Sequence, residues 1–168
     1  MSMPLTLEFR DATEKDVALI LQFIRELAQY EREEYRVTVT EETLRMNLFG
    51  ATPFAHAFIA YHNAEPVAFA IYFFSFSSFS GSPNLYLEDI FVRPAFRGLG
   101  IGKELFAYLA ERANENGCGR MEWAVLNWNE SAIRFYENLG AAPVRGWTVF
   151  HLAKEELEPL AKLRDLRH

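Results

Sequence analysis

The chain of 168 residues has one cysteine, Cys118, so it has neither a disulfide framework nor a cysteine-based zinc site. A lone thiol is typical of a reducing compartment, and we expect a cytoplasmic protein. No apolar run approaches the ~18 residues that span a bilayer. The first residues, MSMPLTLEFRDATEKD, show no basic segment followed by an apolar one. We therefore expect no signal peptide and no membrane role.

Basic residues are also too few for a nucleic-acid binder. Lys plus Arg total 17 against 23 Asp plus Glu, which gives a net charge of −6. Proteins that bind nucleic acid take most of their affinity from contacts between basic side chains and phosphates. Repeats and linkers rich in Pro, Gly or Ser are absent too. The composition therefore predicts one soluble domain that comprises residues 1–168.

Hydrophobic periodicity predicts alternating strands and helices along the chain. The candidate N-terminal caps of the helices are Thr13 with Asp16, Thr40 and Asn129. The candidate C-terminal caps are Gly50, Gly117 and Gly140, and we expect Gly50 to be left-handed. The expected strands are Leu5–Arg10, Phe54–His62, Val67–Phe76, Leu85–Val92, Met121–Leu126 and Trp147–Leu152. The expected helices are Val17–Ala28, 41–49, Ile101–Asn116 and 130–139, and Lys154–Arg167 is expected to be a charged amphipathic tail. This order predicts an α/β fold with a mixed sheet and helices on both faces.

The segment with a chemical signature is Arg97-Gly98-Leu99-Gly100-Ile101-Gly102, which follows the strand Leu85–Val92 and opens a helix. Glycines at alternate positions leave backbone N–H groups unshielded and permit angles that point them into one concavity. The helix N-terminus adds partial positive charge. These features predict a phosphate or diphosphate site with Arg97 and Lys103 at its rim.

Two common phosphate motifs do not fit this segment. A Walker A loop needs Gly at position 97 and Ser or Thr at 104, where the chain has Arg97 and Glu104. A dinucleotide fingerprint needs Gly at position 103, which is Lys103. An ordinary glycine-rich turn between strand and helix remains the alternative.

Several segments together resemble a known family. The Arg97-to-Gly102 loop and the segment Trp128–Tyr136, WNESAIRFY, are similar to the two signatures of the GNAT acyltransferase superfamily. Further segments resemble its diamine N-acetyltransferases, both the spermidine/spermine and the thialysine branches. They are Glu26–Glu31, Gly50–His56, Tyr86–Asp89 and Gly146-Trp147. The resemblance covers residues 6 to 152 and implies a GNAT-like, mostly antiparallel sheet, acetyl-CoA as co-substrate and a homodimer.

The resemblance implies that Tyr136 is the acid that protonates the departing thiolate. A phenol is protonated at neutral pH and can donate a proton to sulfur. Helical spacing with Ala132, Ile133 and Leu139 would by itself favour a core tyrosine.

Glu88 is the candidate base, acting directly or through water, because a carboxylate in an apolar strand is costly unless it is used or paired. An ion pair with Arg93 or Arg97 is the alternative. Strand alternation sends Asp89 to the opposite face, so we expect only one of the two carboxylates to face the cleft.

The remaining expected roles concern the two substrates. The backbone of Ile90, Phe91 and Val92 is expected to pair with the pantetheine arm of acetyl-CoA, as an added strand would. Asn129 either contacts the cofactor or only caps its helix. The resemblance places Tyr30 and Glu31 in the acceptor pocket.

Position 77 distinguishes between the two branches. Polyamine-acetylating members have an acidic residue at the position that aligns with Ser77, which favours a lysine-like amino acid or a small diamine as the acceptor here. We expect no metal site, because the histidines have no partners at ligand spacing. Alternative functions are a protein or peptide N-acetyltransferase and a non-catalytic acyl-CoA sensor.

Overall fold

A computed structural model describes residues 6–164, which form two compact units divided after Trp128. The first unit contains a five-stranded sheet in the order β1-β2-β3-β4-β5. Its strands are β1 (Leu7–Asp11), β2 (His56–His62), β3 (Glu65–Ser77), β4 (Ser82–Val92) and β5 (Met121–Trp123). Only the β4–β5 pairing is parallel. The mixed, mostly antiparallel sheet that we expected is confirmed.

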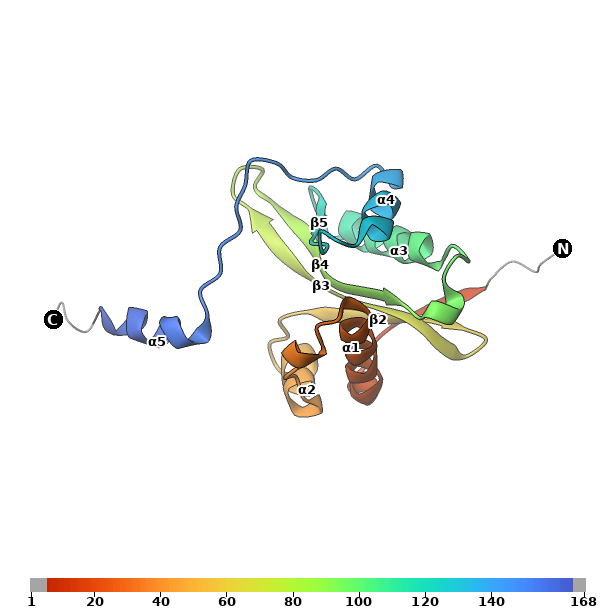
Figure 1. Ribbon diagram of the computed structural model, residues 1–168, viewed down its shortest axis with the longest axis horizontal. Helices are drawn as coiled ribbons and strands as arrows, with labels where there is room; N and C mark the ends of the chain where they lie inside the picture. Colours follow the sequence, from red (N-terminus) through yellow and green to blue (C-terminus); the bar gives the residue numbers. More distant parts are fainter. Residues whose placement is uncertain (1–5, 165–168) are drawn as a thin grey trace. The chain divides into compact units, whose positions relative to one another are not determined.

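Helices cover both faces of this sheet (Figure 1). On one side lie α1 (Val17–Glu31) and α2 (Glu41–Phe49), and on the other lies α3 (Ile101–Glu115). Short 3-10 turns η1 (Glu14–Asp16), η2 (Glu34–Arg36) and η3 (Pro94–Phe96) connect these elements. None of the helices in residues 6–164 is long and apolar enough to cross a membrane.

Aromatic and aliphatic side chains fill the space between the sheet and α1. Phe23 of α1 stacks on Phe69 of β3 with ring centroids 5.0 Å apart, and both are fully buried. Ile20, Leu27 and Ile71 belong to the same buried cluster. Because burial of such side chains drives folding, this cluster fixes where the C-terminal end of α1 lies against β4.

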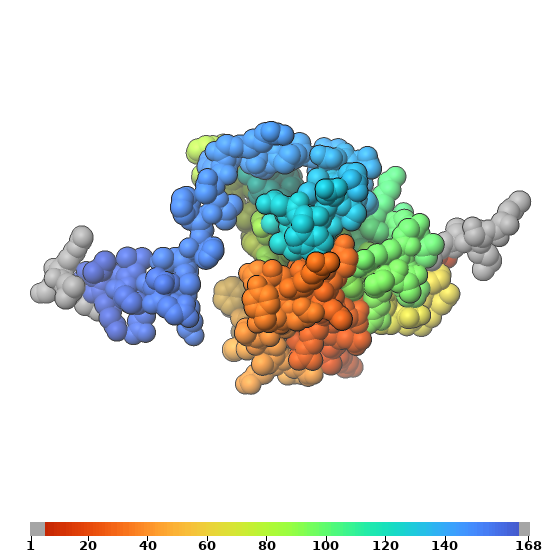
Figure 2. Space-filling model, in the orientation of Figure 1, coloured from red at the N-terminus to blue at the C-terminus, as the bar shows by residue number. Residues whose placement is uncertain are grey.

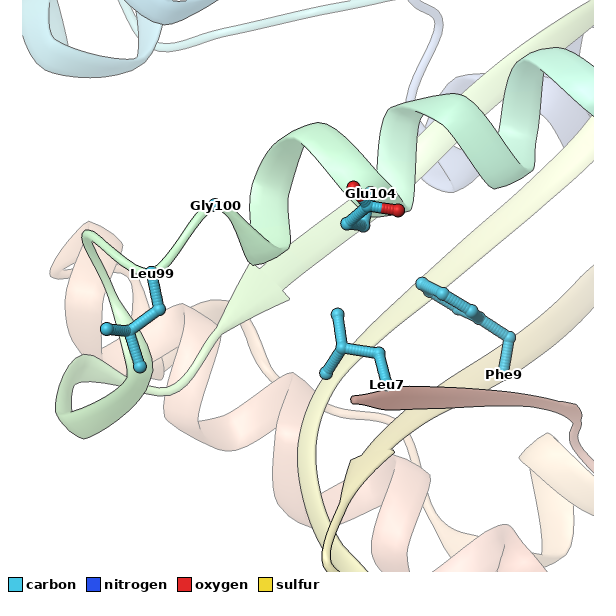
Figure 3. A pocket seen from close by; sticks show the side chains of 5 residues that line it. All are labelled: Leu7, Phe9, Leu99, Gly100 and Glu104. Atoms are coloured by element: carbon cyan, nitrogen blue, oxygen red, sulfur yellow. The ribbon is translucent and has the colours of Figure 1, made fainter. Parts of the chain in front are cut away.

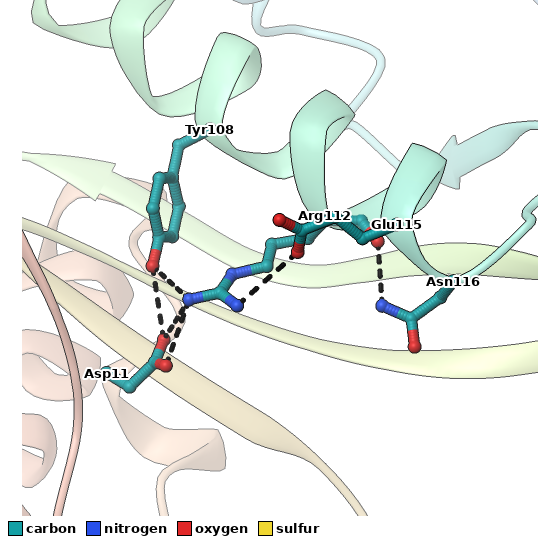
Figure 4. A network of polar contacts seen from close by, with 5 residues as sticks. All are labelled: Asp11, Tyr108, Arg112, Glu115 and Asn116. Carbon is teal, nitrogen blue, oxygen red and sulfur yellow. Dashed lines mark hydrogen bonds and ion pairs between the residues drawn. The ribbon is translucent and has the colours of Figure 1, made fainter.

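On the other face, a polar network joins α3 to β1 (Figure 4). The Tyr108 hydroxyl donates to Asp11 Oδ1 at 3.2 Å, and Arg112 Nη2 lies 2.9 Å from Asp11 Oδ2. The Tyr108 ring stacks on Phe9, 4.8 Å between centroids. The network sets the position of α3 on the sheet and hence the position of its N-terminus.

Gly50 ends α2 as predicted but not in the predicted conformation. Its φ is −70°, so the expectation of a left-handed cap was wrong. A Cβ at this position would lie 2.3 Å from the Met46 carbonyl oxygen. Glycine is therefore required because the backbone passes close to the last turn, and not because of φ.

The second unit contains α4 (Glu130–Asn138) and α5 (Lys154–Lys162), with an extended segment between them. The expected strand Trp147–Leu152 was wrong, since these residues form neither strand nor helix. Their alternating aromatic and β-branched side chains suit a strand, but a strand also needs a neighbour for its backbone hydrogen bonds. Trp147 is 78% exposed and Phe150 89% exposed.

Candidate active site

The glycine-rich turn between β4 and α3 adopts the geometry expected for an anion site. Gly98 and Gly100 have φ of 77° and 85°, and Gly100 directly precedes α3. Within the described residues, none of the backbone N–H groups from Gly98 to Gly102 donates to another group of the chain. Regular donation resumes with the N–H of Lys103, which bonds to the Gly100 carbonyl at 3.0 Å. A run of unpaired amides at a helix N-terminus favours a phosphate group.

The space in front of this turn is open. A Cβ built on Gly98 or Gly100 would meet no atom within 4 Å. Lys103 is exposed beside the turn, whereas the Ile101 side chain is buried in the core, so only its backbone can serve a ligand. The residues present therefore fit a diphosphate held by main-chain amides.

A pocket of about 390 Å³ borders the turn on its β1 side (Figure 3). It is lined by Leu7 and Phe9 of β1, Leu99 and Gly100 of the turn, and Glu104 of α3. The Glu104 carboxylate and the apolar floor do not suit an anion. This pocket is therefore a neighbour of the amide turn and not the diphosphate site itself.

Strand β4 is longer than its parallel neighbour β5. Part of the β4 edge therefore has no partner strand for its backbone hydrogen bonds. Pairing between β4 and β5 covers only Leu85–Leu87 and Met121–Trp123 in the described residues. The segment Glu88–Val92 of β4 continues past that point toward the glycine turn. The predicted backbone contacts of Ile90, Phe91 and Val92 to pantetheine need such an opening, and β4 provides it.

A β-bulge interrupts β4 at the expected catalytic carboxylate. Tyr72 of β3 pairs with Leu87, and Ile71 pairs with Asp89, so Glu88 has no partner in β3. The extra residue breaks strict alternation. Leu87 and Asp89, two residues apart, therefore lie on opposite faces of the sheet, because their partners Tyr72 and Ile71 do. The assumption of alternation at this point was wrong.

The bulge gives Glu88 and Asp89 different surroundings. Glu88 is exposed and forms no ion pair with Arg93 or Arg97, contrary to the alternative from the sequence. Asp89 shares the face of Ile71, which packs in the α1 cluster. Burial, and then repulsion by the charges of Glu88 and Glu31, raises the pKa of Asp89 to about 6. The charge of Glu31 therefore acts on the buried carboxyl of Asp89.

Glu31 at the end of α1 also has an unusual environment. Burial raises the pKa of its carboxyl, and Glu33 adds to that effect while Arg36 opposes it. The structure therefore brings together Glu31, Glu88 and Asp89, three carboxylates from α1 and β4.

Arg97, which we expect at the rim of the turn, is held by contacts within the chain. Its Nε donates to the Val92 carbonyl at 2.9 Å, and its guanidinium lies 4.4 Å from the centre of the Tyr30 ring. Tyr30 also contacts Phe91 and Trp128, with ring centroids 6.4 and 6.2 Å apart. Figure 2 shows the orange atoms of α1 adjoining the green atoms of this loop. The expected cofactor and acceptor residues are therefore in direct contact.

Two further residues at this site, Arg93 and Trp128, make contacts that the sequence did not predict. Arg93 lies 3.0 and 2.9 Å from the Glu26 carboxylate through Nε and Nη2, and its Nη1 donates to the Pro66 carbonyl at 2.8 Å. Trp128 places its indole against Tyr30. An Arg-Pro pair directly after a buried strand was the available signal for Arg93. Trp128 opens the segment WNESAIRFY that resembles a GNAT signature, but nothing in that segment predicts its contact with Tyr30.

The remaining predicted residues belong to other elements: Ser77 to β3, and Asn129 and Tyr136 to α4 and its cap. Ser77 pairs with Ser82 at the far end of β3, six residues from the Ile71–Asp89 pair, about 20 Å at the rise of a strand. Asn129 is the N-cap of α4 and accepts from the Ala132 N–H at 3.3 Å, which confirms its capping role. Tyr136 lies in α4, half-buried, with its ring 5.5 Å from that of Phe135.

In residues 6–164, no group of three or more His, Cys, Asp or Glu side chains is arranged to hold a metal ion.

Strand β4 continues past its pairing with β5 and leads into a turn of unpaired amides. This arrangement suits a ligand that carries a phosphate group beside an open strand edge. Residues 23–141 match the model of the acetyltransferase (GNAT) family. The chain belongs to this family, and it is an acetyltransferase.

The sequences of several relatives and one solved structure are similar to this chain. The chain is 40% identical to the thialysine N-epsilon-acetyltransferase of Bos taurus over 163 residues, which cover 90% of this chain and 95% of the relative. It is 29% identical to the L-ornithine N5-acetyltransferase NATA1 of Arabidopsis thaliana, with coverage of 92% and 87%. The solved structure of an integron cassette protein from V. cholerae superposes with a TM-score of 0.77 at 25% identity, with coverage of 96% and 99%.

Proposed function

We propose that the protein transfers the acetyl group of acetyl-CoA directly to a primary amine of a lysine-like amino acid, thialysine included, or of a small diamine or polyamine. The observation that carries this proposal is the run of unpaired amides from Gly98 to Gly102, beside the open edge of β4. The diphosphate would bind these amides, and the pantetheine arm would pair with Ile90, Phe91 and Val92. Arg97, Lys103 and Asn129 complete the proposed cofactor contacts.

The proposed chemistry needs one base and one acid from the chain. The bound thioester supplies an activated acetyl group. Glu88, directly or through water, takes the proton of the acceptor ammonium, because only the neutral amine is a nucleophile. The amine nitrogen forms the new C–N bond as the C–S bond breaks, and Tyr136 gives its proton to the thiolate. The acetylated nitrogen then loses its second proton, which returns through solvent to the Tyr136 oxygen. Glu88 releases the first proton to solvent, so both groups are restored.

The acceptor site is proposed at the carboxylates near the end of α1. Tyr30 and Glu31 lie there, and the charges of Glu88 and Asp89 are close enough to act on one another. Such a surface favours a substrate with one or more ammonium groups. The relatives named for thialysine and ornithine support an amino acid with a side-chain amine. Ser77 is included as an acceptor residue on the resemblance alone.

A thiol-release assay tests the function most broadly. Purified protein with acetyl-CoA is offered thialysine, lysine, ornithine, diamines, spermidine and peptide amines. We expect release of free CoA with thialysine-like acceptors and little with peptides. Binding of CoA by calorimetry without turnover of any amine would instead indicate a sensor. Turnover of peptides alone would indicate a protein acetyltransferase.

Two variants test the assigned acid and base. Tyr136→Phe should lower kcat by 10² to 10⁴-fold, the usual contribution of a positioned proton donor, with little change in the Kd for acetyl-CoA. Glu88→Gln should abolish the acidic limb of the pH dependence of kcat/KM. A Tyr136→Phe enzyme with unchanged kcat, or a Glu88→Gln enzyme with an unchanged pH profile, would contradict the respective assignment.

We further propose a cytoplasmic homodimer, with no nucleic acid or membrane as partner. The single cysteine, Cys118, fits a reducing compartment.

A further inference from the structure

The end of α1 carries an arginine whose position the proposed function leaves unexplained. Arg32 directly follows Glu31, and it closes the helix in the left-handed conformation, with φ 61° and ψ 35°. Its N–H bonds back to the Ala28 carbonyl, and so does the N–H of Glu33, at 2.9 Å. This cap reverses the chain at the acceptor site. A residue other than glycine or asparagine is uncommon in this conformation.

The reversal places the Arg32 side chain on an aromatic face. Its guanidinium carbon lies 5.9 Å from the centre of the Trp128 ring, and Trp128 in turn contacts Tyr30. Arg32 and Trp128 are both exposed. A guanidinium over an aromatic face is held in place, and because Arg32 is exposed its N–H groups are accessible from solvent.

The neighbouring arginines are engaged with carboxylates, but Arg32 is not. Arg36 lies 3.6 Å from Glu33, and Arg93 forms its close pair with Glu26. Among the described residues, Arg32 forms no ion pair, although glutamates surround it in the sequence. The fork of donors on Arg32 is therefore available to a ligand.

The charges at this site form two groups of opposite sign. Glu31, Glu88 and Asp89 supply the negative group, and Arg32 on Trp128 supplies a positive group next to Glu31 in the chain. A purely cationic diamine or polyamine would be attracted by the first group and repelled by the second. A zwitterion would be complementary to both.

We propose that Arg32 binds the α-carboxylate of the acceptor and thereby selects an amino acid with a side-chain amine over a diamine of the same length. A guanidinium can bind a carboxylate through two parallel N–H···O bonds. Trp128 supports Arg32 from behind, and Glu31 is adjacent to receive the α-ammonium group. This inference rests on the proposed function, because it names the acceptor class of the same site.

The test compares two acceptors that differ only in the carboxylate. They are S-(2-aminoethyl)-L-cysteine (thialysine) and its decarboxylated analogue, 2-(2-aminoethylthio)ethylamine. Arg32→Asn is the informative variant, because asparagine tolerates the left-handed conformation and removes the charge. Arg25→Asn is the control, because it removes the same charge from an exposed position two turns earlier in α1. Arg32→Lys keeps the charge without the paired donors.

The native enzyme should have the higher kcat/KM with thialysine. In Arg32→Asn the ratio of kcat/KM for thialysine to that for the diamine should fall about tenfold or more, the usual effect of losing a hydrogen-bonded charge. Arg25→Asn should leave the ratio within about twofold, and Arg32→Lys should be intermediate. Thermal unfolding of each variant checks that the fold is retained.

Two results would overturn the inference while the proposed function stands: a native preference for the diamine, or an equal change for both acceptors in Arg32→Asn. Turnover of neither acceptor by native protein that binds acetyl-CoA would be a different failure. It would overturn the proposed acceptor class itself, and this inference with it.

Discussion

At the scale of single residues, Glu88 and Asp89 of β4 show which features the sequence can predict and which it cannot. The run LYLEDIFV predicts a buried strand with two acids near its middle, and this is confirmed. The face of the sheet on which each carboxylate lies depends on the β-bulge, an extra residue in β4 relative to β3. That insertion is a property of the pairing between two strands, so the pattern of one strand does not reveal it.

Asp89→Asn should stabilise the fold above pH 6. Because burial raises the pKa of Asp89 in the folded state to about 6, compared with an ordinary value near 3.9, the charged carboxylate destabilises the folded state. That loss is absent below about pH 4, where the group is protonated in both states, and it is complete above pH 6. The variant should therefore gain about 2 kcal/mol in free energy of unfolding at pH 8 and nothing at pH 3.5.

Urea unfolding at both pH values measures this difference. Glu88→Gln is the control, because it removes the neighbouring charge from an exposed side chain and should change stability by less than about 0.5 kcal/mol. A loss of stability in Asp89→Asn at pH 8 would show that the carboxylate is favourably bound in the fold.

At the scale of secondary-structure elements, the junction of β4 with the glycine turn is held by Arg93. Its side chain joins Glu26 of α1 to the Pro66 carbonyl of β3 and lies 4.6 Å from the centre of the Phe23 ring. The sequence predicted the strand, the turn and the helix here, because apolar runs, an Arg-Pro pair and glycines mark them. The ion pair between Arg93 and Glu26 joins residues that are 67 positions apart in the chain, so no local sequence pattern predicts it.

Arg93→Ala should lower the free energy of unfolding by about 2 kcal/mol, because it leaves the half-buried Glu26 carboxylate without its partner. It should also weaken acetyl-CoA binding, since Arg93 positions the start of the turn. The matched control is Arg120→Ala. Arg120 forms an ion pair with Glu122 at 3.0 Å, but its side chain is 57% exposed. Arg120→Ala should therefore lower the free energy of unfolding by less than about 1 kcal/mol. Equal losses in the two variants, measured by chemical denaturation, would contradict the role assigned to Arg93.

At the scale of the whole molecule, the structure confirms the mixed sheet, the helices on its faces and the glycine-rich turn, which all follow from local patterns. The segment after α4 does not, since the alternating side chains of Trp147–Leu152 lie in an extended, unpaired chain. A pattern of side chains predicts that a segment suits a sheet, but it does not supply the neighbouring strand.

The exposed side chains of this segment lead to a prediction about assembly. Large apolar groups such as Trp147, Val149 and Phe150 are buried in interfaces more often than they remain in water. Native protein should therefore run in light scattering at twice its 19.4 kDa chain mass. Phe150→Ser should shift it toward the monomer. Phe79→Ser, an equally exposed phenylalanine in the β3–β4 turn, should not. A monomeric native protein would contradict the expected homodimer.

The most direct test of the proposed function is a crystal structure of the protein with acetyl-CoA bound. The backbone N–H groups of Gly98 to Gly102 should lie within hydrogen-bonding distance of the diphosphate oxygens, with the thioester at the open edge of β4. Electron density that places the diphosphate away from these amides, or no binding at saturating acetyl-CoA, would contradict the assignment of this site.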